Sequence, residues 1–506
     1  MNKLPELLFP SHRFNQDRIA LLDPAGTSVT YSRLWERVDR LGRQLREAGS
    51  THGTTVGILA PKNDGCVVSI CAVLATGAAY VPVDPYMPAT RACSIFADCQ
   101  TRLLIVGDDL VQDLVSHLAC GLETLPCSEP GLSILKCSLD TTKEPTYTED
   151  LAVILYTSGS TGTPKGVQLT HTNALAFIFW CVNTFDLSDC DVCASTAPFQ
   201  FDLSLFDLFV SLYRGATILL LEHRTCQNPL LVAASLSEHK VSVCYATPTM
   251  LKMLLRHGRL PRLDFSALKL VLFAGEEFPI VPLRELKSLW HQARFYNLYG
   301  PTESNVVTFQ AIPDEIDPLQ QQPFPIGRPC EHVQCLLATA SGCTQLVPGT
   351  EGELLVWGPS VTPGYYADRE KNLAAFLLAD DGRHYYRTGD FVRGEESGAL
   401  QVLGRRDRTV KRRGDRIALE ELERVLGLHP AACEVAVKSS MLGPETTIDA
   451  YFVARSDCIV PAKSALKLHC QEFLPAYFLP DRFIVLESLP KTSTGKIDYR
   501  NLECSQ

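Results

Sequence analysis

The stretch LAVILYTSGSTGTPKG (residues 151–166) places a glycine-rich loop directly after an apolar run. The apolar run predicts a buried strand, and YTSGSTGTPKG (156–166) supplies three glycines, three threonines, two serines and one lysine. Small residues let backbone N–H groups approach a phosphate, and Lys165 adds positive charge. The Walker pattern is absent, so the loop is not a P-loop of that type. A polar surface loop is the ordinary interpretation of such a run, but its place after a buried strand favours phosphate binding.

The sequence around this loop alternates between strands and helices. Residues 30–49 carry apolar side chains spaced for one helix face and end at Gly49, whereas TTVGILA (54–60) and AAYVPVD (78–84) predict buried strands. The alternation continues to about residue 310 and indicates α/β layers. Short strands separated by glycine and proline from about 326 to 405 predict a smaller β-rich subdomain. Strands such as EVAVKSS (434–440) and a helix near ALEELERVLG (418–427) predict a compact α+β module at the end.

Size and composition narrow the class of protein. A chain of 506 residues exceeds the usual single-core size, so we expect two or more domains. A formal net charge of −10 disfavours a nucleic-acid partner, which requires a basic surface. The N-terminal residues lack the apolar run of a signal peptide, and no stretch reaches the roughly 18 apolar residues of a membrane span. We therefore expect a cytoplasmic protein with no membrane partner.

The 19 cysteines are irregularly spaced. Cys190 and Cys193 form the one close pair with metal or redox spacing, without a second pair or nearby histidines to complete a zinc site. An odd count without a secretion signal indicates free thiols in a reducing compartment.

Eight segments, taken in order, resemble the motif set of the adenylate-forming (ANL) superfamily. This superfamily contains acyl-CoA ligases, luciferases and the adenylation domains of nonribosomal peptide synthetases. Any one segment is a weak signal, but eight in the family order, spread over nearly the whole chain, are very specific. Besides the loop at 156–166 they are AAYVPVDP (78–85), FDLSLFDLF (201–209), NLYGPTE (297–303), GELLVWGPSVTPGYY (352–366), YRTGD (386–390), GRRDRTVKRRGDRI (404–417) and LPKTSTGKIDYR (489–500).

The resemblance implies two domains of unequal size. Residues 1–406 would form a large adenylation core of layered α/β subdomains plus the β-rich subdomain, and residues 407–506 a small mobile α+β domain. Asp407 would be the hinge, and Gly414 would line the tunnel that admits a thiol. Rotation about the hinge would move Lys496 away and bring a thiol-facing surface in, so that one pocket serves both half-reactions. The sequence departs from the common pattern at Ala418, where an acidic residue is frequent.

The chemistry implied is activation of a carboxylate with ATP. A carboxylate is a poor electrophile until it is joined to AMP, and the enzyme must hold two anions together while charge builds. Lys496 resembles the catalytic lysine that bridges the substrate carboxylate and the α-phosphate; without the motif it would be a solvated lysine. Glu303, with Thr157 or Thr161, is similar to the residues that place Mg²⁺ on the triphosphate. The resemblance thus assigns catalysis to Lys496, Glu303 and Thr157, and metal binding to Glu303 and Thr161.

A second set of residues is implied for the nucleotide. Asp390 resembles the aspartate that binds both ribose hydroxyls, and Tyr299 the aromatic residue that stacks on adenine. In isolation the first would be a turn residue and the second a core aromatic. Arg405 belongs to a basic run at 405–416 that would otherwise be a solvated face. The complete implied set is Thr157, Ser158, Gly159, Ser160, Thr161, Gly162, Lys165, Gly275, Glu276, Asn297, Tyr299, Gly300, Thr302, Asp390 and Arg405.

Asp202 decides the substrate class. It sits where amino-acid-activating members of the superfamily place the aspartate that pairs with the substrate ammonium, a carboxylate that fatty-acyl and aryl-acid activators lack. A helix N-cap is the rival interpretation. The remaining pocket positions, aligned by motif offsets, are apolar except for one tyrosine hydroxyl, which predicts a small apolar amino acid. These positions are Leu203, Phe206, Tyr245, Leu272, Ala274, Leu298, Val306 and Val307.

The pocket residues, completed by Lys496, are similar to the specificity codes of free-standing L-prolyl carrier-protein ligases. D-Alanine carrier ligases are the first alternative, and peptide-synthetase domains for valine or leucine the next. The chain ends within ten residues of Lys496 with no carrier domain, so we expect the acceptor to be a separate carrier protein, or coenzyme A. Two further hypotheses remain open: acyl-CoA synthesis from a simple carboxylic acid, against which Asp202 argues, and a non-catalytic nucleotide-binding protein that uses the basic run.

Overall fold

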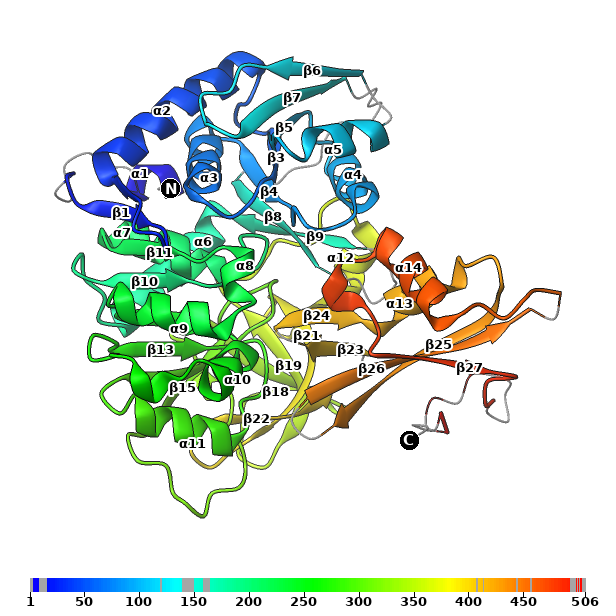
Figure 1. Ribbon diagram of the computed structural model, residues 1–506. Coiled ribbons are helices and arrows are strands. Elements are labelled where there is room, and N and C mark those ends of the chain that lie inside the picture. Colours follow the sequence, from blue (N-terminus) through cyan, green and yellow to red (C-terminus); the bar gives the residue numbers. More distant parts are fainter. Residues whose placement is uncertain are drawn as a thin grey trace.

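The computed structural model describes residues 3–8, 16–118, 121–138, 150–157, 164–405, 408–412, 414–442, 445–455, 457–491, 497, 499 and 501–502. Two units built on large sheets, a β-rich unit and a small C-terminal unit make up this part of the chain (Figure 1). A short helix, α1 (Leu4–Leu8), precedes them.

The first large sheet has seven strands in the order β6-β7-β5-β3-β4-β8-β9. The middle strands β5, β3, β4 and β8 are parallel, and the outer strands are antiparallel. Helices α2 and α3 pack on one face and α4 and α5 on the other. The bounds are β3 (Thr55–Leu59), β4 (Ala79–Pro82), β5 (Leu103–Gly107), β6 (Gly121–Leu125), β7 (Leu132–Ser138), β8 (Leu151–Thr157), β9 (Lys165–Thr170), α2 (Tyr31–Ala48), α3 (Asp64–Thr76), α4 (Ala89–Asp98) and α5 (Val111–His117).

Helix α2 illustrates how local sequence sets these elements. The hydroxyl of Thr30 accepts a hydrogen bond from the backbone amide of Arg33, which caps the first turn. Gly49 ends the helix with a φ of 107°, a backbone conformation that glycine adopts without strain. The predicted apolar face is buried against α3. The helix expected over residues 30–49 is therefore confirmed.

The second large sheet has nine strands in the order β16-β15-β14-β13-β12-β10-β11-β1-β2. Helices α9, α10 and α11 pack on one face, while α6 and the π-helix η1 lie on the other, in a core shared with α2 and α3. The strands are β1 (Ile19–Leu22), β2 (Ser28–Thr30), β10 (Val192–Ser195), β11 (Thr217–Leu220), β12 (Val243–Ala246), β13 (Leu270–Phe273), β14 (Arg294–Tyr299), β15 (Thr308–Ile312) and β16 (Arg328–Pro329). The helices are α6 (His171–Thr184), η1 (Phe206–Val210), α7 (Ser211–Arg214), α8 (His223–Cys226), α9 (Pro229–Glu238), α10 (Pro248–His257), η2 (Leu260–Arg262) and α11 (Ile280–Leu289).

The β-rich unit and the C-terminal unit follow. The first is a six-stranded antiparallel sheet, and the second combines a hairpin, a three-stranded sheet and two helices. The β-rich unit contains β17 (Gln334–Thr339), β18 (Gly342–Thr344), β19 (Glu351–Trp357), α12 (Arg369–Ala375), β20 (Phe376–Leu378), β21 (His384–Gly394) and β22 (Leu400–Arg405). The C-terminal unit contains β23 (Thr409–Arg412), β24 (Asp415–Ala418), α13 (Leu419–Gly427), β25 (Ala432–Leu442), β26 (Glu445–Ala454), α14 (Lys463–Phe473), η3 (Ala476–Phe478) and β27 (Arg482–Leu486).

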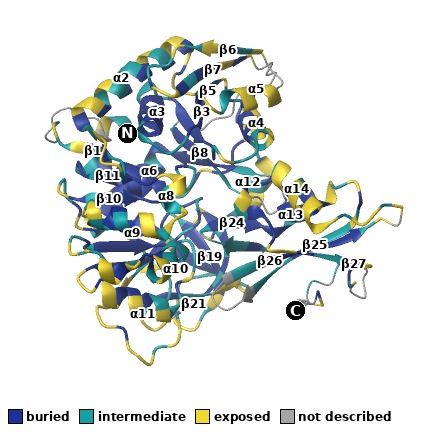
Figure 2. Cartoon of the chain, in the orientation of Figure 1, coloured by how far each residue is buried: buried dark blue, intermediate teal, exposed yellow. Residues whose placement is uncertain are grey.

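The predicted fold class is confirmed: layered α/β subdomains and a β-rich subdomain precede a small α+β module. Figure 2 shows the central strands of the large sheets buried, with exposed residues on the outer sides of the helices. Strands β10, β12, β13 and β14 are parallel neighbours, so their carboxyl ends meet at one edge, where open α/β sheets bind ligands.

Two further observations concern the whole described chain. None of its described helices combines the length and apolarity that crossing a bilayer requires. The described cysteines are free thiols, with Cys190 exposed and Cys193 buried, and no described group of three or more metal-ligating side chains is gathered as a metal site would require.

Candidate active site

The predicted substrate pocket lies at the carboxyl ends of the parallel strands. Seven of its eight apolar positions are buried in one core cluster, and Leu203 packs against that cluster. Tyr245 of β12 pairs with Leu272 of β13, and the ring of Phe206 meets the ring of Tyr245 edge-on at 5.4 Å between centroids. Residues from three strands and from η1 are thus brought together as predicted. Apart from the tyrosine hydroxyl, the side chains offer no polar group to a substrate.

Asp202 lies in the turn that leads into η1. The helical run that contains η1 begins at Ser204, two residues after Asp202. Asp202 lines a cavity of about 80 Å³ together with Thr157, Thr302 and Gly414. Burial of the carboxyl, followed by the nearby charge of Glu303, raises the pKa of Asp202 to about 6, while the Thr302 hydroxyl and the Lys411 ammonium act in the opposite direction.

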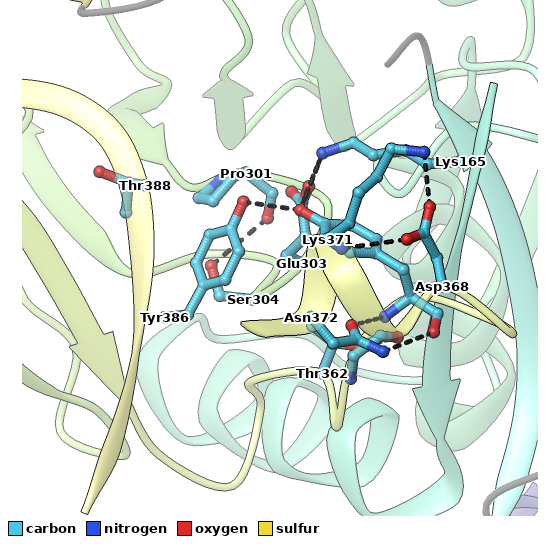
Figure 3. Close-up of polar contacts among 12 residues, drawn as sticks. Lys165, Pro301, Glu303, Ser304, Thr362, Asp368, Lys371, Asn372, Tyr386 and Thr388 are labelled. Atoms are coloured by element: carbon cyan, nitrogen blue, oxygen red, sulfur yellow. Dashed lines mark hydrogen bonds and ion pairs between the residues drawn. The ribbon is translucent and has the colours of Figure 1, made fainter. Parts of the chain in front are cut away.

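Glu303 is fully buried and paired with the loop lysine. The Nζ of Lys165 lies 2.7 Å from the Glu303 carboxylate, and the Tyr365 hydroxyl donates to the same carboxylate oxygen at 2.9 Å. Figure 3 shows Lys165 and Glu303 side by side, near the ion pair of Lys371 with Asp368. A buried carboxylate held by a cation at the end of a glycine-rich loop is suited to phosphate and metal chemistry.

The ends of the glycine-rich loop are fixed by the sheet. Thr157 ends β8, Lys165 begins β9, and the two residues are paired across the strands. The Thr157 Oγ1 is buried without a hydrogen-bond partner among the described residues, which leaves a hydroxyl for a ligand. The loop residues between them, Ser158, Gly159, Ser160, Thr161 and Gly162, lie outside the described residues.

A second cavity, of about 240 Å³, gathers most of the residues predicted for the base and the ribose. Asp390 is buried there and accepts hydrogen bonds from the Tyr299 hydroxyl at 2.6 Å and from Arg405 at 2.8 Å. Burial and the Asp390 carboxylate raise the pKa of Tyr299. The residues predicted for the nucleotide that line this cavity are Gly275, Glu276, Asn297, Tyr299, Asp390 and Arg405; Leu298, predicted for the substrate, lines it too.

Gly300 follows the aromatic residue of this cavity and has no room for a side chain. A Cβ at this position would lie 1.5 Å from the carbonyl oxygen of Asn305, so even alanine would displace the backbone. The turn from β14 to Thr302 and Glu303 therefore depends on glycine.

Comparison with known proteins assigns this arrangement to a family. The model of the AMP-binding enzyme family matches residues 11–366, and that of the AMP-binding enzyme C-terminal domain matches residues 421–496. The chain belongs to the AMP-binding enzymes. The predicted membership of the adenylate-forming superfamily is thus confirmed, and ATP use follows from the family.

This AMP-binding enzyme is similar to curated ligases over nearly its whole length. It is 34% identical to an L-proline--[L-prolyl-carrier protein] ligase of Streptomyces coelicolor, over 94% of this chain and 91% of that one. It is 31% identical to a D-alanine--D-alanyl carrier protein ligase of Bacillus licheniformis, over 94% of each. The amide bond synthetase McbA of Marinactinospora thermotolerans shares its fold, with a TM-score of 0.85 and 24% identity over 99% of each chain.

The C-terminal unit of the AMP-binding enzyme presents its β23–β24 hairpin to the site. Lys411 lies with its Nζ 5.2 Å from the Tyr299 ring centroid and lines the same cavity. Gly414, with a φ of 88°, sits against Gly275 and Thr247, where a Cβ would come within 2.4 Å of the threonine methyl. Gly414 also lines the cavity that contains Asp202.

The predicted catalytic lysine is Lys496, and the predicted hinge residue is Asp407. Lys496 and Asp407 lie outside the described residues of the AMP-binding enzyme. On either side of Lys496, Lys491 pairs with Glu434 at 2.5 Å, and Ile497 packs against the core of the three-stranded sheet.

Some lining residues of the AMP-binding enzyme were not among the predicted site residues. Lys411 and Gln401 line the nucleotide cavity, and Tyr365 holds Glu303. Lys411 and Tyr365 stand inside recognised motifs, so motif position was a signal that could have identified them. Gln401 has no such signal, because it reaches the cavity only through the pairing of β21 with β22.

Proposed function

We propose that this enzyme activates L-proline with ATP and transfers the prolyl group to the phosphopantetheine thiol of a separate carrier protein. The observation that carries the proposal is the Asp202 carboxylate in a cavity next to the predicted pocket positions, whose side chains are apolar apart from the Tyr245 hydroxyl. The proline ring is apolar and its NH₂⁺ offers two donors to Asp202. The 34% identity to an L-prolyl carrier-protein ligase supports the same substrate.

The first half-reaction joins a carboxylate oxygen of proline to the α-phosphorus of ATP and breaks the bond to pyrophosphate. We assign Asp202 to the ammonium of proline, Asp390 to the ribose hydroxyls, Tyr299 to adenine and Lys165 to the triphosphate. Lys496 would bridge the reacting carboxylate and the α-phosphate. These contacts bring the two anions together and stabilise the charge that builds between them.

Mg²⁺ is the metal we propose for the triphosphate, where it would neutralise phosphate charge. Glu303 and Thr157 fit this ion, because both offer hard oxygen ligands: the Glu303 carboxylate is buried, and the buried Thr157 hydroxyl has no hydrogen-bond partner among the described residues. Thr161 is the further candidate ligand.

In the second half-reaction the thiol sulfur bonds to the prolyl carbonyl carbon, the thiol loses its proton, and the bond between that carbon and AMP breaks. We propose that residues 1–406 and 407–506 are the two domains that alternate between the steps. Asp407 would be the hinge, and Gly414 would line the thiol path. The orientation with β23–β24 at the site would be the thioester-forming one.

The test is ATP–pyrophosphate exchange with twenty amino acids and D-alanine. We expect the highest exchange rate with L-proline, followed by labelling of a phosphopantetheinylated carrier protein but not of its unmodified form. D-Alanine is the alternative supported by the Bacillus licheniformis relative, and a higher rate with D-alanine would replace proline. Silence with every amino acid in the presence of ATP and Mg²⁺ would refute the proposal.

Replacing Asp390 by alanine should weaken ATP binding specifically. The carboxylate accepts hydrogen bonds that are strong because it is charged, and such bonds contribute about 1.5–3 kcal/mol each. We expect the KM for ATP to rise roughly tenfold to a hundredfold, with the KM for proline changed much less. Exchange kinetics at varied ATP and varied proline measure both values. A larger effect on proline than on ATP would contradict the ribose assignment.

The ion pair of Arg91 with Glu421 ties the C-terminal unit to α4. Arg91 Nη1 lies 2.6 Å from a Glu421 oxygen, the Glu421 side chain is fully buried, and the guanidinium lies 5.4 Å from the Phe478 ring centroid. Arg91→Met would leave the Glu421 charge without its partner in this orientation. We therefore expect prolyl transfer to the carrier to slow about tenfold while exchange stays within about twofold.

Single-turnover transfer from isolated prolyl-AMP checks this expectation. Arg40→Met is the matched control, because Arg40 forms an exposed ion pair with Glu36 on α2. Such pairs contribute little, so this variant should behave as wild type. Equal slowing of exchange and transfer by Arg91→Met would show that the pair does not favour one orientation.

A further inference from the structure

Lys62 connects the two large sheets at the point where the substrate-binding segment begins. It lies between β3, in the seven-stranded sheet, and α3. Its ammonium donates hydrogen bonds to the backbone carbonyls of Ser195 at 2.6 Å and Ala197 at 2.7 Å. The same ammonium lies 5.3 Å from the ring centroid of Phe199. One side chain thus makes three contacts with a single turn that belongs to the other sheet.

This turn leads directly to the residues that would contact the amino acid. Ser195 ends β10 and pairs with Tyr245, and the Thr196 hydroxyl donates to the carbonyl of Tyr245 at 2.9 Å. Further along, the Ser204 hydroxyl donates to the carbonyl of Phe201 at 2.6 Å, and the Leu205 amide donates to the carbonyl of Asp202 at 3.0 Å. The chain from β10 to η1 is therefore a series of short, internally bonded turns, and Lys62 holds its first part.

Water could not easily take over the hydrogen bonds that the Lys62 ammonium donates. Ser195 is fully buried, and 8% of Ala197 is exposed, so solvent has little access to the two carbonyls. Asp207 on η1 is also buried; burial raises the pKa of its carboxyl to about 7, while the Lys62 charge acts in the opposite direction. A buried carbonyl that loses its donor is unfavourable, so loss of the ammonium should make the turn shift.

We propose that Lys62 is a positioning residue for amino-acid recognition, fixing the 195–201 turn and thereby the placement of Asp202 against the substrate ammonium. This inference rests on the proposed function of Asp202. Lys62 does not touch the substrate; it acts through the turn. A displacement of about 1 Å at a recognition group can reduce the rate a hundredfold, so a small shift of the turn has a measurable effect.

The test compares Lys62→Met and Lys62→Arg with wild type in the exchange assay. Lys62→Met should lower kcat/KM for the amino acid by about tenfold to a hundredfold, mainly through KM, while the KM for ATP stays within about threefold. Lys62→Arg keeps a cation on a similar stem and should recover most of the loss. Selectivity for proline over alanine should also fall in the methionine variant, because a displaced Asp202 no longer holds the ring in one place.

Lys287→Met is the matched control. Lys287 is buried and donates to the carbonyls of Ala293 at 2.7 Å and His291 at 3.4 Å and to the Asp314 carboxylate at 2.9 Å, but at the amino end of β14, opposite the site. The Lys287→Met variant should lower Tm, but it should not raise the KM for the amino acid more than the KM for ATP. Lys62→Met with wild-type kinetics, or with equal losses toward ATP and the amino acid, would overturn the inference. Silence of the wild-type enzyme with every amino acid would instead refute the proposed function.

Discussion

Asp202→Ala should weaken the use of proline more than any other single change in the substrate pocket. The ammonium of bound proline would lose its carboxylate partner, and losing one partner of such a pair costs about 2–5 kcal/mol. This corresponds to a fall in kcat/KM for proline of roughly 30-fold to several-thousand-fold. Exchange kinetics with varied proline measure it.

The control for Asp202→Ala is the KM for ATP, because Asp202 is not among the residues that line the nucleotide cavity. We expect this value to stay within about threefold of wild type. An unchanged KM and kcat for proline would show that Asp202 has only a structural role in its turn. Recovery of activity with a carboxylic acid that lacks an amino group would strengthen the assignment, since such a substrate does not need the carboxylate.

The same residue predicts a pH dependence. Burial and the charge of Glu303 raise the pKa of Asp202 to about 6, so in the free enzyme the carboxylate is ionised above this pH and protonated below it. Only the ionised form can pair with an ammonium. We expect kcat/KM for proline to be level above about pH 7 and to fall about tenfold per pH unit below the pKa. In Asp202→Asn, which cannot ionise, this acidic fall should disappear from the remaining activity.

Local sequence was enough to predict the fold class, and the structure gathers several of the predicted site residues at two cavities. The capped helix α2 and the buried strands β3 and β4 follow from periodicity, glycine and apolar runs, which act over a few residues. The order of the motifs was enough to predict that Tyr299, Asp390 and Arg405 belong to one site, and they line one cavity although β14 and β21 lie far apart in the sequence.

Contacts between distant residues could not be predicted in the same way. Lys62 reaches Ser195, and Arg91 reaches Glu421, through tertiary packing that leaves no periodic pattern near either residue. The π-helix η1 was not expected either, because FDLFV (206–210) is an apolar run whose period does not distinguish helix types. The orientation of the C-terminal unit at the site was also not predictable. It depends on how two folded units dock, and no sequence motif encodes that.

That orientation bears on the prediction for Lys496. The β23–β24 hairpin, with Lys411 and Gly414, faces the cavities. In contrast, Lys491 and Ile497, which flank Lys496, contact other residues of the C-terminal unit. If Lys496 neutralises charge during adenylation, the C-terminal unit has to turn for that step and turn back for transfer. Lys496→Ala should therefore slow exchange by roughly 10²–10³, the effect of losing one charge-stabilising donor. Transfer from pre-formed prolyl-AMP should be much less affected.

Lys491→Ala is the matched control for Lys496→Ala, since it removes a lysine five residues away that is paired with Glu434 on the surface of the C-terminal unit. This variant should leave both steps close to wild type, because a surface pair contributes little to stability. Single-turnover adenylate formation and single-turnover transfer, measured on the same preparations, separate the steps. Equal losses in both steps for Lys496→Ala would mean that the lysine stays at the site throughout, and alternation of the C-terminal unit would then have to be abandoned.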